Sequence, residues 1–163
     1  MLKSFNLYIL MRNDLDSMVP GKAAAQASHA TSMFEDMMRN DFSHFDEEVL
    51  FNYEKWKESG GGHFGTTYVL GCPSRIFENI DENIQEYFNG EGINLSPYGV
   101  VHDPTYPIKD GVCTFHLAID TCSFLFIDKQ MIRLLQTNSN DFSENAYSYG
   151  SMARDYIKEL KLF

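Results

Sequence analysis

Stretches of apolar, β-prone residues recur along the chain and predict the strands of an α/β fold. The first, SFNLYILMR at residues 4–12, is almost continuously apolar and indicates a strand buried on both faces. Three shorter runs of the same kind follow it, each bounded by turn-forming residues. The predicted strands are residues 4–12, 66–70, 98–102 and 112–119.

Between and after these strands, apolar residues recur at helical spacing. An alanine-rich run begins at Pro20, a residue that is favoured in the first turn of a helix. In the next run Phe45, Val49 and Tyr53 recur every four residues, and Phe51 and Trp56 are further candidates for the core. The predicted helices are residues 20–38, 44–59, 74–89, 128–137 and 146–160.

The order of these elements is β-α-α-β-α-β-β-α-α. It predicts a three-layer α/β sandwich with a four-stranded mixed sheet and helices on both faces. The chain has 163 residues, which favours a single domain over residues 1–163. Residues 138–145 read as a loop before the last helix.

The formal net charge of −10 is unusual for a protein that binds nucleic acid, because such proteins normally present a basic surface. The three cysteines form no CxxC pair, so neither a disulfide framework nor a metal site is expected. No stretch is long and apolar enough for a membrane helix, and the first residues do not read as a signal peptide. We therefore expect a cytoplasmic protein.

One face of the alanine-rich helix carries candidate chemistry. At 100° per residue, Lys22, Gln26 and His29 fall on one narrow stripe, next to a stripe of small residues suited to close packing on a sheet. The helix begins at Pro20-Gly21, and its free N–H groups together with Lys22 favour an anion or a developing oxyanion. A lysine in a first turn is also often a plain surface residue.

The segment VPGKAAAQASHA at residues 19–30 resembles the G-K-x-A-A-Q-x-S-H-A signature of the type 2 (archaeal and eukaryotic-type) peptidyl-tRNA hydrolases. Residues 12–15, RNDL, resemble the family's R-x-D-L run, and the ending LKLF resembles L-K-L-Y. His102-Asp103 stands where the family has Gln-Asp. The chain reads as a divergent member of that family.

The resemblance implies an enzyme that cleaves the ester between a peptide and the 3′ ribose of tRNA without metal or cofactor. It assigns catalytic roles to Lys22, to Asp103 and to a nearby threonine. Thr105 or Tyr106 fills the threonine's place, depending on the position of a gap, and Thr114 matches another family threonine. An aspartate is a weak base unless burial raises its pKa, so His29 is the alternative base.

Four further residues are expected to bind substrate: Gly21, Gln26, His102 and Tyr106. Tyr106 is the aromatic side chain placed to stack on the terminal adenosine. His29 has a competing interpretation as a structural hydrogen-bonding residue under the sheet rim, and His102 as the end of a strand.

Three functions remain open at this point. The first is peptidyl-tRNA hydrolysis, with peptidyl-tRNA as the partner, no membrane and a homodimer as an open possibility. The second is a binding module of the same fold that has lost turnover and recognises tRNA, another nucleic acid or a protein. The third is hydrolysis of small aminoacyl or acyl esters, which needs no basic surface for tRNA.

Overall fold

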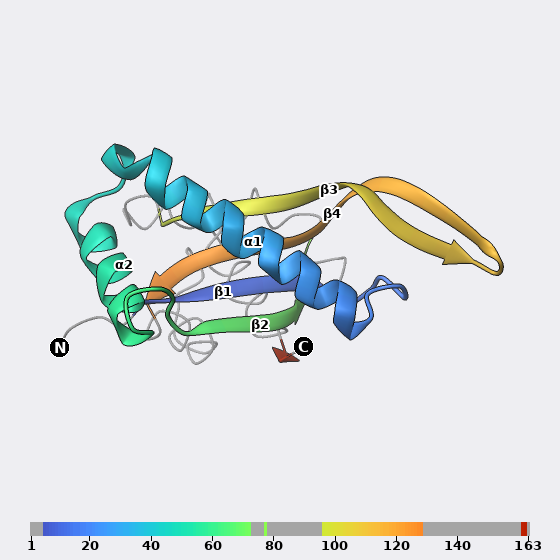
Figure 1. Cartoon of the computed structure of the whole chain (residues 1–163), viewed down its shortest axis with the longest axis horizontal. Helices are drawn as coiled ribbons and strands as arrows, with labels where there is room; N and C mark the ends of the chain where they lie inside the picture. Colours follow the sequence, from blue (N-terminus) through green and yellow to red (C-terminus); the bar gives the residue numbers. More distant parts are fainter. Residues whose placement is uncertain (1–4, 73–76, 78–95, 129–160, 163) are drawn as a thin grey trace, which may run out of the picture.

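The computed structural model describes residues 5–72, 77, 96–128 and 161–162. Their core is a mixed sheet in the order β3-β4-β1-β2-β5, crossed by one long helix (Figure 1). β1 pairs in parallel with β2 and antiparallel with β4, while β3 and β5 pair antiparallel at the two edges. The elements are β1 (Phe5–Arg12), α1 (Pro20–Asn40), η1 (Phe42–His44), α2 (Glu47–Ser59), β2 (Thr67–Cys72), β3 (Tyr98–Asp110), β4 (Cys113–Asp128) and β5 (Lys161–Leu162).

The prediction of four strands in a mixed sheet is confirmed, and the two-residue β5 extends the sheet by one short edge strand. β1 is buried along six consecutive residues, as expected for a continuous apolar run. Only Phe77 of the predicted helix 74–89 and only Asp128 of the predicted helix 128–137 are described, and the predicted loop 138–145 and helix 146–160 lie outside the described residues. Helices on both faces, and a single domain over the whole chain, therefore stay predictions.

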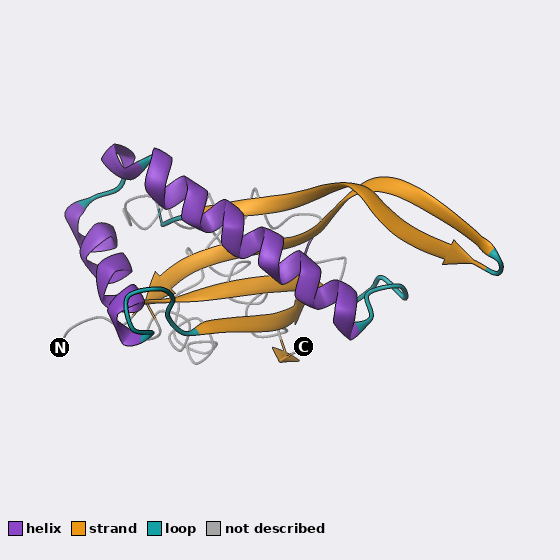
Figure 2. Ribbon diagram, viewed as in Figure 1, coloured by secondary structure: helices purple, strands orange, loops and turns teal. Residues whose placement is uncertain are grey.

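Helix α1 begins at Pro20, as predicted, and ends two residues later than expected. Its buried residues recur every three or four positions and face the sheet. α1 contacts β1, β3 and β4, and it lies across one face of them in Figure 2. The buried residues of α1 are Ala23, Gln26, Ala30, Phe34 and Met38.

Helix α2 begins later than predicted. Residues 42–44 form a separate 3₁₀ turn, and α2 starts at Glu47 because the carboxylate of Asp46 caps it by accepting the N–H of Val49 at 3.1 Å. Val49 and Tyr53 are buried as expected, and so is Trp56. The expectation that Phe51 could join the core is wrong, because its side chain is 50% exposed.

The second half of the sheet differs most from the prediction. β3 continues to Asp110 instead of ending at His102, and β4 runs from Cys113 through Asp128, the residue where a helix was expected to begin. The prolines at 104 and 107 do not stop β3, because it is an edge strand that needs no N–H on its outer side. Register shifts at Val101/His102 and Asp103/Tyr106 mark two irregularities in its pairing.

The extra length forms a hairpin that extends past the end of β1. We call residues 104–119 the arm; it reaches the far right of Figure 1. Gly111 adopts φ of 57° in the turn between Asp110 and Cys113, a conformation that favours glycine in tight hairpins. β4 pairs with β1 only from Cys122 onward, so within the described chain the two strands of the arm pair with each other and, at its base, Ile119 pairs with Asp103.

Candidate functional site

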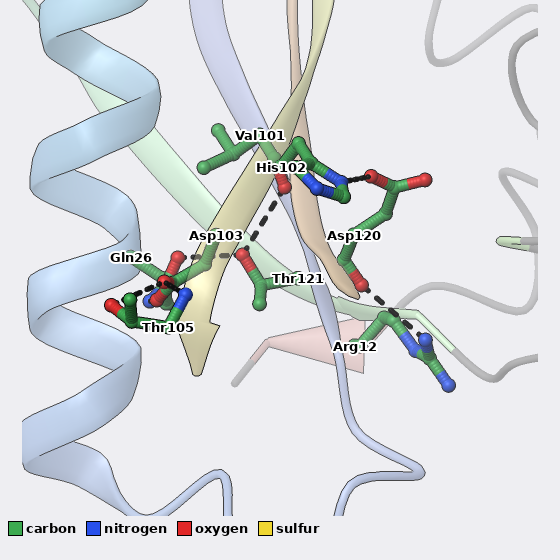
Figure 3. A network of polar contacts seen from close by, with 8 residues as sticks. All are labelled: Arg12, Gln26, Val101, His102, Asp103, Thr105, Asp120 and Thr121. Atoms are coloured by element: carbon green, nitrogen blue, oxygen red, sulfur yellow. Dashed lines mark hydrogen bonds and ion pairs between the residues drawn. The ribbon is translucent and has the colours of Figure 1, made fainter. Parts of the chain in front are cut away.

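The side chain of Gln26 links α1 to both strands of the β3–β4 pair. It is 4% exposed and points from the second turn of α1 toward the sheet (Figure 3). Its Nε2 donates to Oδ2 of Asp103 at 2.6 Å, and its Oε1 accepts the hydroxyl of Thr121 at 2.6 Å. Both ends of the amide are therefore held, which fixes its orientation and that of the Asp103 carboxylate.

Asp103 lies at the second of the two irregularities in β3. Its side chain there accepts hydrogen bonds from a residue that follows it in the same strand. Its Oδ1 accepts the backbone N–H of Thr105 at 2.9 Å and faces the Thr105 hydroxyl at 3.4 Å. The prediction that Asp103 meets the Gln26 edge of the helix is confirmed. Of the two alignments left open, the structure places the hydroxyl of Thr105, not that of Tyr106, beside this carboxylate.

Burial opposes ionisation of Asp103, but the hydrogen bonds from the Thr105 N–H, the Gln26 amide and the Thr105 hydroxyl, with the charge of His29, outweigh it. The net effect lowers the pKa of Asp103 below its ordinary value. The condition under which Asp103 would be an effective base, a pKa raised by burial, is therefore not met. Asp103 is an ionised carboxylate near neutral pH, and it is better suited to orienting a water molecule than to removing a proton from that water.

Thr121 is the member of the network that the sequence interpretation missed. It is fully buried, and its hydroxyl also lies 3.4 Å from the carbonyl of Val101. Thr114, one of the threonines expected at the site, is exposed and pairs with Lys109 near the tip of the arm. Asp103 pairs instead with Ile119, two residues before Thr121. The largely apolar stretch that follows Thr121 in the sequence, residues 122–127, was the available signal for this position.

Lys22 does not donate to Asp103 in this structure. Its Nζ donates to the carbonyl oxygen of Pro107 at 2.5 Å and lies 4.8 Å from the centre of the Tyr106 ring. No carboxylate in the described part of the chain pairs with it. The positive charge therefore stands at the base of the arm, next to the residues that follow Asp103 in β3.

Tyr106 is fully buried, so the expectation that it stacks on an adenosine is wrong. Its hydroxyl accepts from Ser17 Oγ at 3.2 Å and contacts Met18 Sδ at 3.6 Å. The bulge places this ring under the start of α1 instead of at the surface. Tyr106 therefore joins the base of the arm to the segment that leads into the helix.

His29 and Gly21 lie on the exposed part of α1. His29 is one turn from Gln26, and its charge acts on Asp103. Its alternative interpretation, a structural histidine under the sheet rim, does not fit this exposure. Gly21 lies in the first turn with open space around it, which leaves room for a ligand beside Lys22.

His102 belongs to the opposite side of the β3–β4 pair. Its Nδ1 lies 2.9 Å from Oδ1 of Asp120, and Arg12 donates to the Asp120 carbonyl at 3.3 Å (Figure 3). The structure therefore does not bring His102 to Asp103, because successive residues of a strand point to opposite faces. The alternative that His102 ends a strand is also wrong, since β3 continues through it.

The site has a carboxylate, an amide, two hydroxyls, an imidazole and an ammonium group, but no activated thiol. Cys122 Sγ contacts the carbonyl of Gln26 at 3.5 Å, and burial raises the pKa of this thiol to about 12. A protonated, buried thiol is a poor nucleophile. The arrangement therefore favours attack by water over a covalent intermediate on cysteine.

Replacement of Thr121 by valine tests the network. Valine keeps the shape of threonine but leaves Oε1 of Gln26 buried without its donor. We expect the free energy of unfolding to fall by about 1–3 kcal/mol, the usual cost of an unsatisfied buried acceptor. Urea denaturation measures it. Thr121→Ser keeps the hydroxyl and is the control; equal stability of Thr121→Val and the wild type would contradict the network.

The family model described as Peptidyl-tRNA hydrolase PTH2 matches residues 5–76. The match covers β1, α1, α2 and β2, and with them Gly21, Lys22, Gln26 and His29. It confirms the resemblance to that family over this part of the chain, while Asp103, Thr105 and Thr121 lie beyond it. No curated protein matches the chain. None of the helices among the described residues is long and apolar enough to cross a membrane.

Proposed function

We propose that this protein is a peptidyl-tRNA hydrolase that cleaves the ester between the peptide and the 3′ ribose of tRNA. The observation that carries the proposal is the bond between Gln26 and Asp103. Gln26 lies in the segment that matches the hydrolase family, and Asp103 lies outside it. The bond joins a family-matched helix to an ionised carboxylate, which is a group that ester hydrolysis uses.

In the proposed reaction a water molecule attacks the ester carbonyl carbon. Asp103, held by Gln26 and Thr105, accepts a hydrogen bond from this water and orients it. The new C–O bond creates a tetrahedral oxyanion, and the ammonium of Lys22 stabilises its charge. The ester C–O bond then breaks, and the proton lost by water reaches the leaving ribose oxygen, with His29 as the exposed group placed to carry it.

The competing proposal is a binding module of the same fold without turnover. The observation that favours it is the net charge of −10, which opposes broad contact with tRNA phosphates. Measuring peptide release and tRNA binding together separates the two. A binding module that uses phosphate contacts binds tRNA more weakly as salt rises, but it releases no peptide.

Release of peptide from a peptidyl-tRNA analogue, followed with the wild type and with Lys22→Ala, tests the proposed enzyme. We expect Lys22→Ala to lower kcat/KM by about 10²-fold, the size of effect typical for losing one oxyanion-stabilising group. Lys55→Ala is the matched control, because Lys55 is an exposed lysine on α2 that pairs with Glu58.

Two results would count against the proposal in different ways. A wild type that releases no more peptide than buffer alone would exclude hydrolysis of this substrate. A Lys22→Ala variant as active as Lys55→Ala would show that Lys22 takes no part in the reaction, while the proposed activity would still stand.

A further inference from the structure

The arm presents a row of apolar side chains that the rest of the described chain leaves uncovered. Phe115 is 52% exposed, Leu117 is 47% exposed, and Val112 at the tip is fully exposed. Exposed apolar side chains that gather on one element indicate an interaction surface more often than single ones do. The row starts at the base of the arm, where Lys22 donates to Pro107.

The pairing of the arm places this row on one face. Leu117 lies opposite Tyr106 and Phe115 lies opposite Ile108, and residues directly opposite each other share a face. Tyr106 is buried against Ser17 and under Lys22, so this is the face that continues from the start of α1. The apolar row is therefore continuous with the candidate site.

The β4 edge of the arm is also free to pair. Among described residues, β1 accompanies β4 only from Cys122 onward, so residues 113–119 have no strand on their outer side. The other edge of the arm belongs to β3, where Pro104 and Pro107 supply no N–H group. β4 contains no proline, so its free edge is the one able to receive an added strand.

The charge of the arm indicates which kind of ligand it can bind. Residues 104–119 contain one lysine and one aspartate and so carry no net charge, in a chain whose net charge is −10. A neutral apolar arm is unsuited to tRNA phosphates. It suits an extended peptide of varied sequence, because main-chain pairing and a general apolar surface do not depend on particular side chains.

We propose that the arm binds the peptide portion of the substrate, as an extended strand on the free β4 edge with apolar side chains against Phe115 and Leu117. This proposal rests on the proposed function. The ester end of the peptide lies at the base of the arm near Asp103, and its N-terminal end points to the tip. The peptide then runs in the same direction as β4 and forms a parallel pair with it.

The test compares two substrates that share the same ester-forming residue. One tRNA carries N-acetylglycine, and the other carries N-acetylated Leu-Val-Leu-Gly. We expect the wild type to favour the tetrapeptide at least tenfold in kcat/KM. The double variant Phe115→Ser/Leu117→Ser is expected to lose that preference and to keep its activity on N-acetylglycyl-tRNA. N-methylation of the tetrapeptide's amides tests the main-chain pairing and is expected to weaken the preference as well.

The control is His116→Ser, since His116 is exposed and lies opposite Pro107 on the other face of the arm. It should behave like the wild type. A wild type that cleaves both substrates equally would overturn the role of the arm and leave the hydrolase intact, whereas a wild type that cleaves neither would overturn the proposed function. A dimeric wild type and a monomeric double variant with unchanged selectivity, measured by sedimentation equilibrium, would reassign the arm to contact between two copies.

Discussion

Asp103→Asn is expected to lower kcat/KM on peptidyl-tRNA by about 10²-fold, because the attacking water loses the carboxylate that orients it and misplacing a reacting group has a cost of this size. The variant removes the negative charge and keeps the size of the side chain. In the wild type both carboxylate oxygens accept hydrogen bonds, from Gln26 and from Thr105. An asparagine offers one acceptor and one donor in their place, so the network must adjust.

The network has a way to adjust without unfolding. If the Gln26 amide turns over, its oxygen accepts from the new asparagine and its Nε2 faces the hydroxyl of Thr121. That hydroxyl can then accept from Gln26 and donate to the carbonyl of Val101, which already lies 3.4 Å away. We therefore expect Asp103→Asn to fold and to lose activity mainly through the missing charge, with a circular dichroism spectrum and urea midpoint close to the wild type.

The pH dependence gives an independent check of the same carboxylate. Its pKa is lowered, so Asp103 stays ionised until the pH falls below the ordinary aspartate value of about 4. Between pH 5 and 8 no loss of kcat/KM should come from protonation of Asp103. An acidic limb in that interval that disappears in Asp103→Asn would show that the wild-type carboxylate is titrating there, against this assignment.

The first half of the fold is readable from its pattern, because β1 is a continuous apolar run and the buried residues of α1 recur at helical spacing. β1 and α1 accordingly lie within about two residues of their predicted bounds. The full length of β3 and β4 was not predicted, because prolines normally end a strand. β3 tolerates its prolines only because it lies at the edge of the sheet. The exposure of Phe51 was not predicted, because helical spacing alone does not determine which side of a short helix faces the sheet.

Helical spacing predicted which residues of α1 face the site, whereas spacing alone did not identify the site residues on the strands. Gln26 and Asp103 meet as expected, and the resemblance to the hydrolase family is what pointed to Asp103. Thr121 depends on how far β4 slides past β3, and one hairpin turn near Gly111 sets that register. This register cannot be read from the sequence, and the expectation for Thr114 rested on its match to a threonine of the hydrolase family.

Phe34→Ala is expected to lower the free energy of unfolding by about 3–5 kcal/mol, the range for truncating a buried phenylalanine. Phe34 is fully buried at the centre of an aromatic cluster that joins α1, α2 and β4. Its ring centre lies 5.1 Å from that of Phe126 and 5.6 Å from that of Trp56, and Tyr53 and Phe124 lie at 5.8 Å. Urea denaturation followed by the fluorescence of Trp56 measures the loss.

Phe51→Ala is the control, because it removes the same atoms from a ring that is half exposed on α2. It should change the free energy of unfolding by no more than about 0.5 kcal/mol, as surface substitutions do. A small domain is stable by only about 5–15 kcal/mol, so Phe34→Ala removes a large share of the total. Equal losses in the two variants would mean that α1, α2 and β4 do not share this cluster, and the position of Gln26 over the sheet would then lose its support.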